Sequence, residues 1–121
     1  MTLKEYQEKA MATCLPSCNN FSYMMLNLVG EVGELASKVA KSIRKEDAEI
    51  DDNRLCYYHS KEAKEADNAL MLEAGDVLWQ LAGLCKVMGW SLEDVAQANI
   101  DKLAARKMAG TIIGNGDGVI R

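Results

Sequence analysis

Two short acidic motifs stand inside otherwise apolar stretches of this 121-residue sequence. GEVGEL carries Glu31 and Glu34, and EAGDVLWQL carries Glu73 and Asp76. In each motif the two carboxylates are three residues apart, which on a helix places them on one face with about 5–6 Å between their Cβ atoms. Soluble proteins seldom bury acidic side chains, so four of them beside core-forming residues indicate a functional site.

Four carboxylates that converge cannot all stay ionised without a cation, because like charges at short range raise one another's pKa. They therefore either take up protons or bind a metal ion. An all-oxygen cluster suits hard cations, above all Mg²⁺ or Mn²⁺. Because Mg²⁺ usually completes its coordination with water and substrate phosphates, the motifs predict metal-assisted chemistry on a phosphate compound.

Apolar residues recur at spacings of three and four along the chain, and strand-like alternation is scarce, which predicts helices throughout. We expect four helices, over residues 3–13, 21–44, 61–88 and 91–108. Thr2 and Glu5 predict a capping box at the first helix, and Gly89 suits the end of the third. Residues 45–60 are polar and acidic, and we expect them to form a loop with at most a turn of helix.

Long helices with short connections predict an all-α fold, a four-helix bundle, and the length suits one domain over residues 1–121. The segment from about residue 109 to 121 is rich in glycine and is expected to be an irregular tail. The apolar arcs of the second and third helices cover close to half of the circumference. Because one thin bundle could not cover both arcs, we expect a homo-oligomer, either a homodimer or a homotetramer, with the dimer favoured.

A helical wheel with about 100° per residue sorts the second and third helices into core and edge positions. The predicted core positions are Leu28, Val32, Leu35, Val39 and Ile43 in the second helix, and Val77, Leu81, Leu84 and Met88 in the third. The second helix carries along one edge Asn27, Glu31, Glu34 and Lys38. The third helix carries in the corresponding place Glu73, Asp76 and Gln80. Side-by-side packing of these two helices would therefore bring the acidic pairs face to face.

The fourth predicted helix carries the opposite charge beside its apolar face, on a stripe formed by Asn99, Lys102 and Arg106. Lysine and arginine side chains in such a place can reach phosphate oxygens, and Lys38 can do the same from the second helix. A single acidic pair or a single basic stripe is common on a solvated helix face. The prediction of a site therefore rests on all three patterns occurring together beside core positions.

The composition argues against several other classes of protein. A formal net charge of −4 without a long basic stripe argues against a nucleic acid partner. The four cysteines show no CxxC spacing and are expected to be thiols rather than zinc ligands. No membrane span is expected, because Glu73, Asp76 and Lys86 interrupt the most apolar stretch. No signal peptide precedes the first amphipathic segment, so we expect a cytoplasmic protein.

Three motifs in this order resemble the pattern of the MazG-like, all-α nucleoside triphosphate pyrophosphohydrolases: NLVGEVGELASKVAK, EAGDVLWQLAGL and NIDKLAARK. The resemblance covers most of residues 20–108. It implies a helical bundle assembled from two or four subunits. It also implies hydrolysis between the α- and β-phosphates of a nucleoside triphosphate, which yields a nucleoside monophosphate and pyrophosphate.

The resemblance further implies roles for individual residues. The Mg²⁺ ligands would be Glu31, Glu34, Glu73 and Asp76. Contacts to phosphates or sugar would come from Lys38, Asn99, Lys102 and Arg106. Glu34 is favoured by its position as the base that takes a proton from the attacking water. Trp79 either stacks on a nucleobase or packs between subunits.

Two alternatives to a general nucleoside triphosphate pyrophosphohydrolase stay open. One is a related enzyme with another substrate on the same bundle, such as phosphoribosyl-ATP, dUTP or dCTP. The other is a non-catalytic, metal-stabilised helical oligomer that acts as a regulatory interaction module. Gln80 marks a departure from the family pattern, which often has tyrosine at that place.

Overall fold

The computed structural model of the chain describes residues 1–110, except for the side chains of residues 60 and 61. Its α-helices are α1 (Leu3–Met11), α2 (Phe21–Arg44), α3 (Ser60–Val87) and α4 (Leu92–Met108). The shorter elements are the 3-10 helix η1 (Pro16–Cys18) and the strands β1 (Ala48–Asp51) and β2 (Arg54–Tyr57). The predicted all-α class with four helices is confirmed. The glycine-rich tail that we expected lies, from residue 111 onward, outside the described residues.

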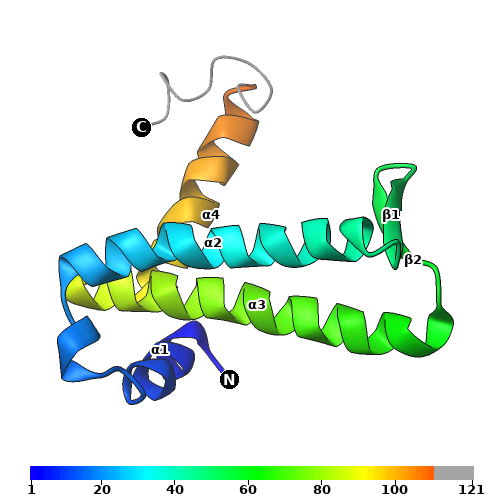
Figure 1. The fold of residues 1–121 in the computed structure, drawn as a ribbon. Coiled ribbons are helices and arrows are strands. Elements are labelled where there is room, and N and C mark those ends of the chain that lie inside the picture. The colour runs from blue at the N-terminus through cyan, green and yellow to red at the C-terminus, as the bar shows by residue number, and fades with distance from the viewer. Residues whose placement is uncertain (111–121) are drawn as a thin grey trace.

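The long helices α2 and α3 form an antiparallel pair to which the other elements are attached (Figure 1). Their mutual contact is the most extensive in the described chain. α1 lies at the end of the pair where α2 begins and α3 ends, and the two strands lie at the opposite end. α4 packs on α1 and α3 and then extends steeply away from the pair. No helix in residues 1–110 combines the length and apolar composition that crossing a bilayer requires.

The most buried part of the described chain lies where α1 meets the long pair. The buried apolar side chains there are Ala10, Met11, Met24, Ala82, Cys85 and Leu92. Trp79 packs against this cluster, and its indole Nε1 donates to the Ala10 carbonyl (3.1 Å) and to Oγ1 of Thr13 (2.9 Å). Because these acceptors lie at the C-terminal end of α1, Trp79 fastens that end to α3. Cys85 is one of four free thiols in the chain.

Gln7 on α1 ties this helix to the junction between α3 and α4. Its Nε2 donates to the carbonyl oxygens of Ala82 (3.2 Å) and Trp90 (3.1 Å). Its Oε1 accepts the backbone N–H of Leu92, the first residue of α4, at 2.9 Å. Ser91 holds the N-cap position, but its side chain forms no capping hydrogen bond. A distant side chain therefore satisfies one of the unpaired N–H groups at the start of α4.

Local sequence signals determine where α1 begins and where α3 ends. Oγ1 of Thr2 accepts the N–H of Glu5 at 3.1 Å, which confirms the Thr2 half of the predicted capping box at α1. Gly89, with a φ of 76°, ends the turn after α3 as predicted. The N–H of Trp90 then reaches back to the carbonyl of Cys85 at 2.8 Å. This left-handed residue followed by a backward hydrogen bond is a common way to close a helix.

The segment over residues 45–60 contains a β-hairpin, so the predicted loop is wrong. β1 and β2 pair antiparallel, with Ala48 opposite Tyr57. Asp52 and Asn53 connect the strands with φ values of 50° and 58°, as in the type I′ turn that favours such residues. Each strand has only four residues, too short a stretch for alternation to stand out against the surrounding helical pattern.

The predicted core stripes are only partly buried. Leu28, Leu35 and Val39 are half-buried on α2, in agreement with the prediction. Three other predicted core residues are 49%, 42% and 43% exposed, namely Val32, Ile43 and Met88. For these three residues the prediction is wrong for the single chain. The physical reason for Val32 and Ile43 is that one neighbouring helix covers a narrower strip than the apolar arc of α2. Met88 is exposed because it lies at the C-cap of α3.

Gly83 on α3 leaves room for the side chain of Met24 from α2, and its replacement should destabilise the fold. A Cβ at residue 83 would overlap Sδ and Cε of Met24, which is fully buried. We expect Gly83→Ala to lower the free energy of unfolding by about 1–3 kcal/mol in a denaturant titration, because the added methyl overpacks the contact.

Gly75→Ala on the same helix is the matched control, since a Cβ at residue 75 meets no atom within 4 Å. There the better helix propensity of alanine should raise the free energy of unfolding by up to about 1 kcal/mol. Equal effects of the two substitutions would contradict the close approach at Gly83.

Candidate metal centre

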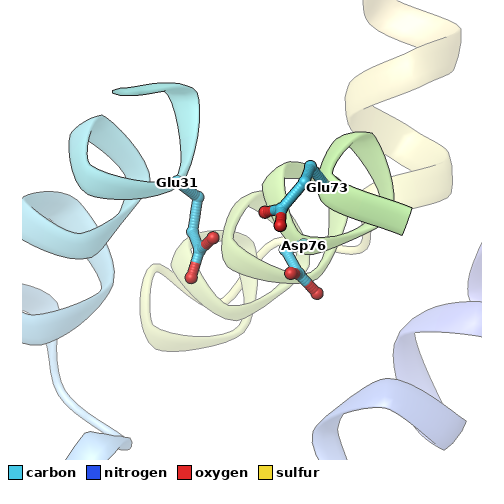
Figure 2. Close-up of side chains that lie close together, drawn as sticks. All are labelled: Glu31, Glu73 and Asp76. Atoms are coloured by element: carbon cyan, nitrogen blue, oxygen red, sulfur yellow. The ribbon is translucent and has the colours of Figure 1, made fainter. Parts of the chain in front are cut away.

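Three carboxylates from two helices meet beside the contact between α2 and α3. Glu31 comes from α2, whereas Glu73 and Asp76 come from α3 (Figure 2). One oxygen atom of each residue lies within 4.8 Å of the others. We call these three residues the acidic trio. The structure thus brings together three of the four acidic residues that the sequence singled out.

Helix geometry places the acidic trio at the border between the helix contact and solvent. Glu73 and Asp76 are three residues apart on α3, so their side chains are neighbours on one face. Glu31 follows the half-buried Leu28 by three residues and lies on the flank of the same α2 face. Glu31 and Glu73 are half-buried, and Asp76 is exposed. An ion or a ligand can therefore reach the trio from solvent.

Burial and the neighbouring negative charges raise the pKa of Glu31 above its usual value of 4.5. Burial is the largest cause, followed by the charges of Asp76, Glu73 and Glu34. A hydrogen bond from Nδ2 of Asn27 at 3.4 Å acts in the opposite direction. A divalent cation between these carboxylates would remove their repulsion. Three carboxylate oxygens are also the donors that Mg²⁺ and Mn²⁺ prefer, so the residues present fit the predicted metal.

A chain of amide side chains leads from the core to Glu31. Nδ2 of Asn27 donates to Oε1 of Gln80 at 2.8 Å, and it also lies 3.2 Å from the hydroxyl of Tyr23 and 3.4 Å from Oε1 of Glu31. Nε2 of Gln80 points to Met24, 3.5 Å from its carbonyl oxygen and 3.4 Å from its Sδ. The side chain of Gln80 is therefore satisfied within the contact between α2 and α3.

Lys38 and Glu34, both singled out by the sequence, lie on α2 after Glu31. Nζ of Lys38 is 3.7 Å from Oε1 of Glu73, an ion pair that joins α2 to α3. Glu34 is exposed and lies outside the acidic trio. On a helix it is about 60° around the axis from Glu31, which turns it toward solvent. Its charge nevertheless contributes to the raised pKa of Glu31.

The other predicted contact residues lie on α3 and α4. Trp79 uses its indole N–H to bind the end of α1, which is a packing role within the chain. Asn99, Lys102 and Arg106 lie on α4, where Asn99 is exposed and the other two are half-buried. Within residues 1–110, neither Asn99 nor Lys102 forms a hydrogen bond or ion pair with the acidic trio.

Two tyrosines near the acidic trio were not among the predicted site residues. The pKa of Tyr6 on α1 is raised by burial and by the charge of Asp76. The hydroxyl of Tyr23 accepts a hydrogen bond from Asn27. The sequence does hold a signal for Tyr23, because residues 23, 27 and 31 follow one another at the four-residue spacing of a helix face. Tyr6 comes from another helix, so no spacing could reveal it.

The raised pKa of Glu31 predicts how stability depends on pH when divalent cations are chelated. A carboxyl whose folded pKa is raised stabilises the folded state below its unfolded pKa, and this contribution is lost as pH rises through the folded pKa. Glu31→Gln cannot ionise. At pH 7 it should therefore melt at a higher temperature than the wild type, and the difference should shrink as pH falls through the raised folded pKa and be smallest once the pH is below 4.5.

The matched control is Glu65→Gln, the same chemical change at an exposed position of α3. It should melt like the wild type throughout the pH range. Addition of Mg²⁺ should raise the melting temperature of the wild type more than that of Glu31→Gln, because a ligand stabilises the state that binds it. A melting difference between Glu31→Gln and the wild type that is the same at all pH values would contradict the crowding of the trio.

Comparison with known proteins agrees with the motifs and with the helical fold. The MazG nucleotide pyrophosphohydrolase domain matches residues 19–110 of the chain. The "Gene 37 protein" of Mycobacterium phage L5 is 38% identical over 101 residues, which cover 84% of this chain and 78% of the phage protein. No solved structure matches the chain. The match over residues 19–110 includes all of α2, α3 and α4, and the chain belongs to the MazG nucleotide pyrophosphohydrolase domain family.

Proposed function

We propose that the protein is a Mg²⁺-dependent nucleoside triphosphate pyrophosphohydrolase, with Mn²⁺ as an alternative metal. It would hydrolyse the bond between the α- and β-phosphates of a ribo- or deoxyribonucleoside triphosphate and release a monophosphate and pyrophosphate. The observation that carries the proposal is the convergence of Glu31, Glu73 and Asp76 within 4.8 Å from two separate helices. Membership of the MazG nucleotide pyrophosphohydrolase domain family supports the same reaction.

In the proposed site, the residues that hold the metal are Glu31, Glu73 and Asp76, with Glu34 as a fourth ligand when its exposed side chain turns toward the trio. When bound, Mg²⁺ supplies charge neutralisation for the triphosphate and orientation for the attacking water. The exposed carboxylate of Glu34 takes the proton from that water, because it lies beside the trio without being one of the three converging groups.

Cationic and polar side chains would bind the phosphates. Lys38 already faces the trio through its ion pair with Glu73, so its ammonium group can contact the departing pyrophosphate. Asn99, Lys102 and Arg106 on α4 are proposed to contact phosphates or sugar. Stacking of a nucleobase on Trp79 stays a prediction, and the hydrogen bonds from its indole to α1 favour packing instead.

Incubation of the purified chain with Mg²⁺ and a panel of canonical and damaged nucleoside triphosphates tests the reaction. We expect stoichiometric monophosphate and pyrophosphate, and Glu34→Gln should lower turnover by at least about 100-fold, as loss of a general base does. Since Glu34 is exposed, the free energy of unfolding of the Glu34→Gln variant should differ from that of the wild type by no more than about 0.5 kcal/mol.

Glu65→Gln is again the matched control and should keep full turnover. Release of orthophosphate would show that another bond is cleaved. Absence of turnover on every substrate, together with a melting temperature that Mg²⁺ raises, would favour the non-catalytic interaction module instead.

We also propose that the protein is a homo-oligomer, with a homodimer favoured over a homotetramer. Large apolar side chains on the long pair are exposed to solvent in the single chain, including Leu26 (73%) and Val29 (70%) on α2 and Met71 (64%) and Leu72 (70%) on α3. Exposed apolar surface of this kind is typical of a protein–protein contact. A second copy of the chain would also cover the apolar arc that α3 leaves open on α2.

Sedimentation at micromolar concentration should give a mass of two or four chains. Val29→Glu should reduce the mass to one chain, because a charge would be buried in the contact. Ile50→Glu, the same change at an exposed apolar residue of β1, is the control and should keep the assembled mass. A wild-type mass equal to one chain would overturn the proposed oligomer.

A further inference from the structure

Gln80 is the only buried polar side chain among those that the structure describes, which leave out residues 60 and 61, and 1% of its surface is exposed. It follows Asp76 by one helical turn. At this burial it cannot touch a substrate or a metal ion. Its hydrogen bonds run instead to two α2 residues, Asn27 and Met24. A buried amide is retained at little cost only where its donors and acceptors are paired, so these contacts define what Gln80 does.

The two ends of the Gln80 amide are distinguishable by what they face. Met24 offers a carbonyl oxygen, which can only accept, and Nε2 of Gln80 lies on that side. Oε1 of Gln80 must then face Asn27, and it accepts from Nδ2 of Asn27 at 2.8 Å. The carbonyl oxygen of Met24 thereby fixes the orientation of the Gln80 amide, and the Gln80 amide fixes the orientation of the Asn27 amide.

This orientation decides which group Asn27 presents to Glu31. With one hydrogen of its Nδ2 held by Gln80, the amide NH₂ of Asn27 has one hydrogen left, which the hydroxyl of Tyr23 at 3.2 Å and Oε1 of Glu31 at 3.4 Å share. The reversed amide would set the oxygen of Asn27 against the oxygen of Gln80 and against a carboxylate, and both contacts would be repulsive. Gln80 therefore selects the attractive contact with Glu31.

We propose that Gln80 is a positioning residue of the metal centre, which acts through Asn27 to hold the Glu31 carboxylate toward Glu73 and Asp76. The inference rests on the proposed function, and it gives Gln80 the role of orienting a metal ligand from within the core. Each helix then steadies a carboxylate of the other. Lys38 of α2 binds Glu73, and Gln80 of α3 acts on Glu31.

The test is the affinity of the full chain for Mn²⁺, measured by calorimetry without nucleotide. Gln80→Leu and Asn27→Ala should each weaken Mn²⁺ binding by about 10-fold or more, as loss of support behind a metal ligand does. The double variant should bind no more weakly than the weaker single variant, because the two residues act in series. Additive losses, or wild-type affinity in either single variant, would overturn the proposal.

Cys85→Ala separates positioning from general loss of stability, since Cys85 is equally buried on the same helix. It should lower the melting temperature and leave Mn²⁺ affinity unchanged. A loss of affinity in Cys85→Ala equal to that in Gln80→Leu would overturn a specific role for Gln80. If Gln80→Leu fails to fold, Asn27→Ala alone decides, because Asn27 is only half-buried.

The same measurements distinguish failure of this proposal from failure of the proposed function. Unchanged Mn²⁺ affinity in Gln80→Leu, with a wild type that releases pyrophosphate, overturns only the positioning role. Weakened affinity in Gln80→Leu, with a wild type that hydrolyses no nucleotide, supports the positioning role and overturns the enzyme. A wild type that binds no Mn²⁺ overturns both.

Discussion

The main constraint on this structure is that three mutually repelling carboxylates lie together across a contact between two helices. Glu31, Glu73 and Asp76 repel one another, so the contact must be rigid enough to keep their oxygens within 4.8 Å. The axial register of α2 against α3 is critical, because a slip by one helical turn is about 5.4 Å, more than the separation of these oxygens. The buried side chain of Met24 packs against Gly83 in the core of the same contact.

Polar contacts across the same helix pair complement the packing. The ammonium group of Lys38 offsets the charge of Glu73, and the amide of Asn27 does the same more weakly for Glu31. Each contact places a positive or donor group next to a carboxylate that is half-buried. Asp76, the exposed member, needs less support because water solvates its charge. Within the acidic trio, the two half-buried carboxylates thus have a donor or a positive group from a neighbouring side chain, whereas the exposed carboxylate relies on water.

Much of this arrangement could be predicted from the sequence, because it depends on spacings within single helices. The pairing of the two acidic motifs follows from their positions beside the core stripes of α2 and α3. Glu34 shows the limit of the method, since a three-residue step also turns a side chain about 60° around the axis, away from the trio. Tyr6 and Gln7 show another limit, because their partners lie far away along the chain. Val32 was expected in the core because the wheel cannot tell how wide a strip one neighbour covers.

The β-hairpin between the long helices lies at the end of the pair remote from the contact of Met24 with Gly83 (Figure 1). Its strands pair with each other, and most of their residues are exposed or half-buried. Surface connections of this kind tolerate insertions and deletions well. Insertions or deletions at the turn of this hairpin should therefore leave the three carboxylates where they are. A change of length in the connection and a change of charge at the metal centre can thus be made independently of each other.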